Sequence, residues 1–160
     1  MKQMRKANRQ KGPEWAMEVF DKAPYVTVSM IRPDGTPYGL PLSLVRGDAD
    51  TFYFHCAGEG EKLDCLRANP MVSLSAVSRC MPKFEPEKNN FTEYYHSAVA
   101  CGRAETVTDS SEKTEALRLL CQRFLPGYME HFDEAIVRSL DRTTVVKITL
   151  TEPPVGKCKP

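Results

Sequence analysis

The chain has 160 residues, of which 41% are apolar and 27% are charged, a mixture typical of one globular domain. Its 22 basic and 21 acidic side chains nearly cancel, which excludes a whole-molecule field that attracts nucleic acid or a membrane. No segment approaches the roughly 18 consecutive apolar residues of a membrane helix. The basic start of the chain has no apolar stretch behind it, so it is not a signal peptide, and we expect a cytoplasmic protein.

The first twelve residues carry five basic side chains and predict a flexible basic arm, followed by a single domain over residues 13–160. Pro13 suits the first turn of a short helix, in which Trp15 and Val19 share a face. Alternating apolar and polar residues then predict strands. Their expected ranges are 25–31, 37–45, 51–56, 71–77, 94–107 and 143–151. Pro41 has no N–H to donate, so its strand is expected at an edge, in a bulge or beside a ligand.

Three further helices are expected among these strands, over residues 61–68, from the cap at Asp109 to the stop at Pro126-Gly127, and over roughly 129–140. Asp109 and Glu112 form a capping-box pattern at the start of the second of them. Residues 79–90 contain two prolines and two asparagines, which predicts a polar connection of the length of a lid or binding loop. The turns between the first strands are too short for crossover helices. The pattern therefore predicts a mainly β protein with flanking helices (α+β), built on a closed or nearly closed antiparallel barrel of about six strands.

The six cysteines, at positions 56, 65, 80, 101, 121 and 158, are widely spaced and form no Cys-x-x-Cys pair. With no export signal, reduced thiols are expected. Only His55 and Cys56 are close in sequence, and neighbours on a strand point to opposite faces, so no metal site is predicted.

Three stretches are candidates for a site. The first, residues 37–44, is either a bulged edge strand or a backbone against which a flat ligand lies. The second, residues 54–62, runs from a strand through a glycine-bearing loop into a helix start, a geometry that favours anions. Glu59 and Glu61 oppose an anion there unless both side chains point away. The third, residues 94–105, is rich in small residues that let a ligand or a second subunit approach the backbone.

In this order, the stretches resemble the pyridoxamine 5'-phosphate oxidase-like flavoproteins, and in particular their nitroimidazole-resistance branch. The residues that carry the resemblance are Tyr53–Ala57, Gly60, Lys62–Pro70, Tyr95–Val99, Gly102–Glu105, Glu112–Leu120 and Val155–Lys157. It covers residues 20–157 and implies an FMN-binding split β-barrel. It also implies a homodimer with the cofactor at the subunit interface, and it leaves FAD open as the flavin.

The resemblance assigns ten candidate cofactor-binding residues. They are Pro41, Leu42, Ser43, His55, Cys56, Ala57, Lys62, Ser97, Val99 and Lys157. Lys62 matches the basic residue near the flavin phosphate, and Lys157 matches a terminal lysine. Cys56 departs from the pattern, since a serine is frequent there and a thiol is a poorer donor. Without the resemblance, Lys62 is equally read as a solvated helix residue and His55 as part of the barrel wall.

The implied activity is a flavin-dependent reductase of small electrophiles such as nitroimidazoles, and hence a role related to antibiotic resistance. His55 is the candidate catalytic residue, as a proton donor, and a mere flavin contact is the alternative. Strand alternation points His96 away from the face of Ser97 and Val99. The competing functions are a flavin-binding or ligand-sensing protein without turnover, and an oxidase like pyridoxamine 5'-phosphate oxidase. The basic arm lacks interleaved aromatic residues, which disfavours a nucleic-acid partner.

Overall fold

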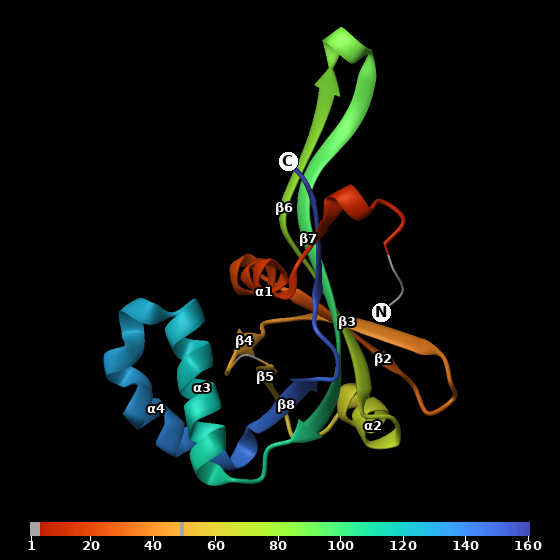
Figure 1. Cartoon of the computed structure of the whole chain (residues 1–160). Helices are drawn as coiled ribbons and strands as arrows, with labels where there is room; N and C mark the ends of the chain where they lie inside the picture. The colour runs from red at the N-terminus through yellow and green to blue at the C-terminus, as the bar shows by residue number, and fades with distance from the viewer. Residues whose placement is uncertain (1–3, 49) are drawn as a thin grey trace.

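The computed structural model describes residues 4–48 and 50–160. Within these residues, nine antiparallel strands form one curved sheet with helices around it (Figure 1). The strands are β1 (Gln10–Lys11), β2 (Val26–Ile31), β3 (Pro37–Leu42), β4 (Val45–Arg46), β5 (Thr51–Cys56), β6 (Met71–Glu85), β7 (Asn90–Thr106), β8 (Thr144–Leu150) and β9 (Val155–Lys159). The helices are α1 (Pro13–Lys22), α2 (Glu61–Ala68), α3 (Ser110–Phe124) and α4 (Phe132–Ser139). Short 3-10 turns cover Ala7–Arg9, Pro86–Lys88, Pro126–His131 and Leu140–Arg142.

The sheet has the order β3-β2-β6-β7-β8-β5-β4, and β9 pairs with both β7 and β1. The path ends at β3 and at β4, so hydrogen bonds do not close the barrel. The predicted fold class is confirmed, with more strands than expected. The predicted strand over 37–45 divides at Ser43 and Leu44 into β3 and β4, and the short strands β1 and β9 carry no strong alternation. Pro41 does lie on an edge strand, because β2 is the one partner of β3 among the described strands.

The region predicted to be a flexible arm contains one 3-10 turn and β1, and residues 1–3 of it lie outside the described residues. β1 pairs with β9, since Gln10 stands opposite Lys157 and Lys11 opposite Gly156. None of the helices in the described part of the chain is long and apolar enough to cross a membrane.

The prediction of a polar connection over residues 79–90 is wrong. These residues belong to a long two-stranded hairpin, formed by the far ends of β6 and β7, that projects from the barrel (Figure 1). The register shifts between Val77 and Arg79 and then continues to the tip, where the rings of Phe84 and Phe91 have centroids 4.7 Å apart. Cross-strand aromatic pairs of this kind stabilise a hairpin, and they are invisible in the local composition.

Two groups of buried apolar residues form the core. The main core fills the barrel and includes the buried face of α1. There, Phe20 of α1 and Phe52 of β5 pack edge to face with ring centroids 5.3 Å apart. A second, smaller core lies between α3, α4 and the outside of β5 and β8. Its buried members are Val45, Tyr53, Val107, Ala116, Leu117, Leu120, Phe132 and Val145. Figure 1 shows α3 and α4 on the side of the barrel where β5 and β8 lie.

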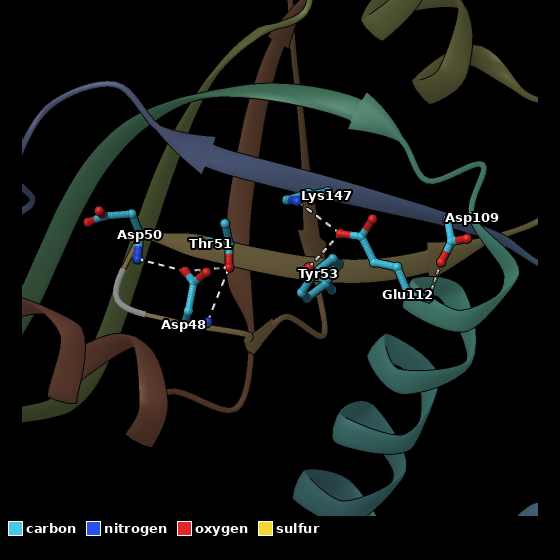
Figure 2. Close-up of polar contacts among 7 residues, drawn as sticks. All are labelled: Asp48, Asp50, Thr51, Tyr53, Asp109, Glu112 and Lys147. Atoms are coloured by element: carbon cyan, nitrogen blue, oxygen red, sulfur yellow. Dashed lines mark hydrogen bonds and ion pairs between the residues drawn. The ribbon is translucent and has the colours of Figure 1, made fainter.

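The N-terminal end of α3 is fixed by a polar cluster (Figure 2). Asp109 caps the helix, because its carboxylate accepts the Glu112 N–H at 2.7 Å, as the capping-box pattern predicts. The Glu112 carboxylate accepts hydrogen bonds from Lys147 Nζ at 2.9 Å and from the Tyr53 hydroxyl at 2.8 Å. The bonds from Lys147 and Tyr53 lower the pKa of Glu112, so it is ionised at neutral pH. This cluster joins α3 to β5 and β8.

The C-terminal end of α3 is fixed by Arg123. Its guanidinium donates to the Leu44 carbonyl oxygen at 2.6 Å and to the carbonyl oxygens of Phe20, Asp21 and Ala23, each at 2.9 Å. One side chain therefore joins α3 to the end of α1 and to the segment between β3 and β4. The sequence analysis gave Arg123 no role.

Candidate functional site

Ser43 and His55 come together at the end of the sheet path where β4 and β5 are neighbours. β4 and β5 are antiparallel, with Val45 opposite Tyr53. Continuing that register by two residues sets Ser43 opposite His55. Among the described residues, neither side chain has a hydrogen-bond partner, and His55 is exposed at the end of β5. Two free polar side chains at the end of a strand are available to a ligand.

Ser43 and His55 line a pocket of about 380 Å³, which we call the helical pocket. Its other walls come from α3, α4 and the turn between them, and residues such as Leu117, Leu120, Phe124 and Ile136 make them apolar. The sequence analysis identified both polar residues and missed the pocket. The apolar stripe of α3 gave the available signal, but it also fits an ordinary core-facing helix.

The glycine loop before α2 has the open geometry of an anion site. Gly60, at φ +127°, precedes the helix, and no side chain caps the first N–H groups. A Cβ at Gly60 would meet no atom within 4 Å, so the backbone there is open to a ligand. Lys62 is half-buried, with its Nζ 5.4 Å from the centroid of the Phe54 ring. Uncapped backbone N–H groups, the positive end of the helix dipole and a lysine in the first turn are the usual elements of an anion site.

Arg32 forms an ion pair with Glu61, whose negative charge would otherwise repel an anion at this loop. Its Nε lies 2.5 Å from the Glu61 carboxylate, and its guanidinium stands 4.6 Å from the centroid of the Tyr38 ring. The negative charge of Glu61 is thereby paired. Sequence reasoning missed Arg32 as part of this site, because the two residues are 29 positions apart and Arg32 reads as part of a turn.

Cys56 and Ala57 lie between His55 and the glycine loop. Cys56 is half-buried and Ala57 is exposed. Burial raises the pKa of the Cys56 thiol, and the nearby charge of Lys62 opposes this without cancelling it. The thiol is therefore neutral at pH 7 and offers only a weak S–H donor. All six cysteines are free thiols in the structure.

The other predicted site residues lie on the outer face of the sheet, away from the helical pocket. Ser97 stands opposite Lys157 and its hydroxyl donates to the Lys157 carbonyl oxygen at 3.5 Å, a long bond. Lys157 Nζ lies 5.5 Å from the centroid of the Tyr95 ring. Val99 is 38% exposed and stands opposite Val155. Within one chain, Ser97, Val99 and Lys157 therefore do not lie in the same pocket as Ser43 and His55.

Pro41 and Leu42 lie on the same edge strand but on opposite faces. Leu42 packs against the main core. Pro41 is exposed, and it continues a row that runs through Thr27, Ser75 and Val99 across β3, β2, β6 and β7. We call these four residues the outer row. They are small or of moderate size, and all are exposed.

His96 points away from the outer face, as predicted. Its ring packs against Trp15 of α1, with centroids 5.2 Å apart. Burial lowers the pKa of His96, and the charge of Arg79 adds to the effect, so the imidazole is neutral at pH 7. Its role is packing between α1 and β7.

The residues present fit a flavin. The glycine loop, Lys62 and the start of α2 suit a phosphate, while Ser43 and His55 offer free polar groups to the edge of a flat ring at the mouth of the helical pocket. The fold and this site define an α+β protein with an open antiparallel split barrel.

The family model of the pyridoxamine 5'-phosphate oxidases matches residues 13–155. The chain belongs to that family. No curated protein matches the chain.

Several solved structures share the fold. A protein of Bacteroides thetaiotaomicron named for 5-nitroimidazole antibiotic resistance is 19% identical, with a TM-score of 0.75, and covers 92% of this chain and 87% of its own. The flavocytochrome Anf3 of Azotobacter vinelandii is 21% identical, with a TM-score of 0.83, over 98% of this chain and 72% of its own. An FAD and heme binding protein of Mycobacterium smegmatis is also 21% identical, with a TM-score of 0.78, over 94% and 73%. At such identities the likeness establishes the fold.

Proposed function

We propose that the protein is a flavin-dependent reductase that binds FMN and reduces small electrophiles such as nitroimidazoles. One observation carries the proposal: two unpartnered polar side chains, Ser43 and His55, open onto an apolar pocket, and β5, which carries His55, leads through the glycine loop to the uncapped start of α2. The family match over residues 13–155 supports it, as does the likeness to the nitroimidazole-resistance protein. The free thiols fit the cytoplasmic location that we propose for this activity.

Each residue of the site has a distinct role in this proposal. Lys62 and the first N–H groups of α2 bind the phosphate, and Arg32 keeps the charge of Glu61 away from it. Ser43 hydrogen-bonds the polar edge of the ring. A bound flavin supplies hydride transfer, and the protein supplies orientation and exclusion of water. His55 delivers the proton that reduction of a nitro group consumes.

We further propose a homodimer, which joins the two separate groups of site residues. The outer row leaves Thr27, Ser75 and Val99 exposed on the face opposite the main core. Small side chains allow two backbones to approach closely, and a two-fold axis covers the same surface twice. Ser97, Val99 and Lys157 of one protomer would then meet the flavin held mainly by the other.

The dimer predicts a solution mass of twice the 18.0 kDa of the chain. Ser75→Glu should shift the equilibrium to monomer, because it places two like charges near the two-fold axis in a water-excluded interface. Ser111→Glu, on the exposed first turn of α3, is the control and should stay dimeric. Sedimentation at micromolar concentration checks this. A wild-type mass near 18.0 kDa would contradict the dimer.

Lys62→Ala should weaken FMN binding roughly 10- to 100-fold, because a charge-assisted bond to phosphate contributes about 1.5–3 kcal/mol. Arg67→Ala is the matched control, since Arg67 lies at the other end of α2 and pairs with Asp64 at 2.8 Å. Titration of FMN into flavin-free protein measures both, and the same titration with FAD decides between the two flavins. Equal dissociation constants for Lys62→Ala and the wild type would remove Lys62 from the site.

Reduction itself is tested by adding NADH or NADPH to the flavin-loaded protein and then a 5-nitroimidazole. Bleaching of the flavin, and its recovery when the nitro compound is added, are the expected results. A flavin that binds but is never reoxidised by any nitro compound would leave a binding protein and overturn the reductase.

A further inference from the structure

The helical pocket has apolar walls of defined origin. α3 forms one wall and is held at both ends, by the Glu112 cluster and by Arg123. α4 forms the other wall, with Ala135 and Ile136 toward the pocket, while Val137 points away and is 82% exposed. Among the residues that the structure describes, no Asp, Glu, Lys or Arg side chain lines the pocket. A charged ligand group would lose its hydration there without gaining a partner, so the pocket suits a neutral ligand.

The free polar groups of the pocket gather at one end. Ser139 donates its hydroxyl to the Ala135 carbonyl oxygen at 3.0 Å, and Thr143 donates to the Ser139 carbonyl oxygen at 2.8 Å. Those two hydroxyls are already used as donors. Ser43 and His55 are not, so a ligand finds its strongest polar contacts at the strand end and apolar contact elsewhere. This arrangement orients an elongated molecule with its polar end at His55.

The size of the pocket sets the size of the ligand. A cavity of about 150 Å³ holds one benzene molecule. The helical pocket, at about 380 Å³, is therefore too large for one small ring and has room for two rings.

We propose that the helical pocket binds the body of the substrate, and that this substrate is a neutral molecule with two fused or linked rings whose polar, reducible group lies at His55. The reduction rests on the proposed function, whereas the binding does not. Single-ring nitroimidazoles underfill the pocket and are poorer substrates. Molecules that carry a phosphate or carboxylate on the ring body are excluded from it.

The test compares two tryptophans on one helix. Ala135→Trp fills the pocket from an exposed position of α4, and Val137→Trp is its matched control on the outward face of the same helix. The probe is 6-nitroquinoline, and calorimetry measures its binding to flavin-free protein. Ala135→Trp should raise the dissociation constant about tenfold or more, because the second ring loses its buried apolar contact. Val137→Trp should leave it unchanged.

Two further probes test the size and charge of the ligand. 3-Nitropyridine, with one ring, should bind more weakly than 6-nitroquinoline to the wild type and should respond less to Ala135→Trp. The anion 4-nitro-1-naphthoate should not bind in the pocket, and binding as tight as that of 6-nitroquinoline would overturn the neutral class. If Ala135→Trp does not fold by circular dichroism, Cys121→Phe fills the pocket from α3 with the same expected loss.

The outcomes separate this inference from the proposed function. Unchanged 6-nitroquinoline binding in the filled variants overturns the pocket as the substrate site. Loss of FMN binding in Ala135→Trp, measured in the same preparation, also overturns it and assigns the pocket to the flavin. If the probe binds in the expected pattern but the protein never reduces it, the helical pocket is supported as the ligand site and the proposed reductase activity is wrong.

Discussion

Arg123→Ala is expected to lower the free energy of unfolding by about 2–4 kcal/mol, because one half-buried cation satisfies four carbonyl oxygens. Burial lowers the pKa of Arg123, yet a guanidinium stays protonated at all pH values in proteins. Without it, the carbonyl of Leu44 and those at the end of α1 lose their partner. Urea unfolding of wild type and variant measures the difference.

Two comparisons make the Arg123 result specific. Arg123→Lys should fall between the wild type and Arg123→Ala, since an ammonium has three donors and lacks the planar fork that reaches several acceptors. Arg142→Ala removes an exposed arginine and should change stability by less than about 0.5 kcal/mol. If Arg123→Ala lowers the free energy of unfolding as little as Arg142→Ala does, water replaces the four hydrogen bonds at no cost and the proposed role of Arg123 is wrong.

The same substitution reaches the candidate site through α3. Arg123 holds the helix to Leu44, which directly follows Ser43. Loosening this end of α3 therefore disturbs the wall and the polar end of the helical pocket together. Stability and 6-nitroquinoline affinity should fall in parallel in Arg123→Ala.

Local signals were enough to predict much of the fold. The strand over 51–56 and the helix over 61–68 have the predicted bounds, and α3 lies between the predicted cap at Asp109 and the predicted stop at Pro126, because each is delimited by its own residues. Asn69-Pro70 stops α2 and Asp109 starts α3. Such stop and cap signals act within one turn of the chain, so they can be recognised in the sequence without knowing which elements pack against the helix.

The long hairpin could not be predicted in this way. Its residues are polar and include Pro82, which stands opposite Glu93 in the ladder. Pairs such as Phe84 with Phe91 and the short bond from the Tyr94 hydroxyl to Glu85 stabilise it across the two strands. Composition along one strand does not reveal partners on the other.

The candidate site was predicted only in part, because some of its contacts also join residues on different elements. The sequence placed Ser43, His55 and Lys62 among the candidates, and the structure places the first two on one pocket. Arg32 was missed because its partner Glu61 lies on another element. The apolar walls from α3 and α4 were missed because an apolar helix face predicts a core, and only the three-dimensional packing leaves space beside it.

His55→Gln is expected to lower the turnover per bound flavin by about 10²–10⁴-fold, the usual contribution of a positioned proton donor. Glutamine keeps a hydrogen-bonding side chain at the end of β5 but cannot deliver a proton. FMN affinity should change by less than about threefold, because the phosphate contacts at Lys62 supply most of the binding. Steady-state rates with a nitro substrate, divided by flavin occupancy from absorbance, give the comparison.

His96→Gln is the matched control for this experiment. His96 is the neighbouring candidate by residue type, but its ring packs against Trp15 on the other face of β7, so its loss should leave the normalised rate unchanged. A general effect of removing a histidine would appear in both variants. If His55→Gln instead loses FMN affinity and keeps its turnover per bound flavin, His55 is a contact of the ring. The proton must then come from water or from another group of the site.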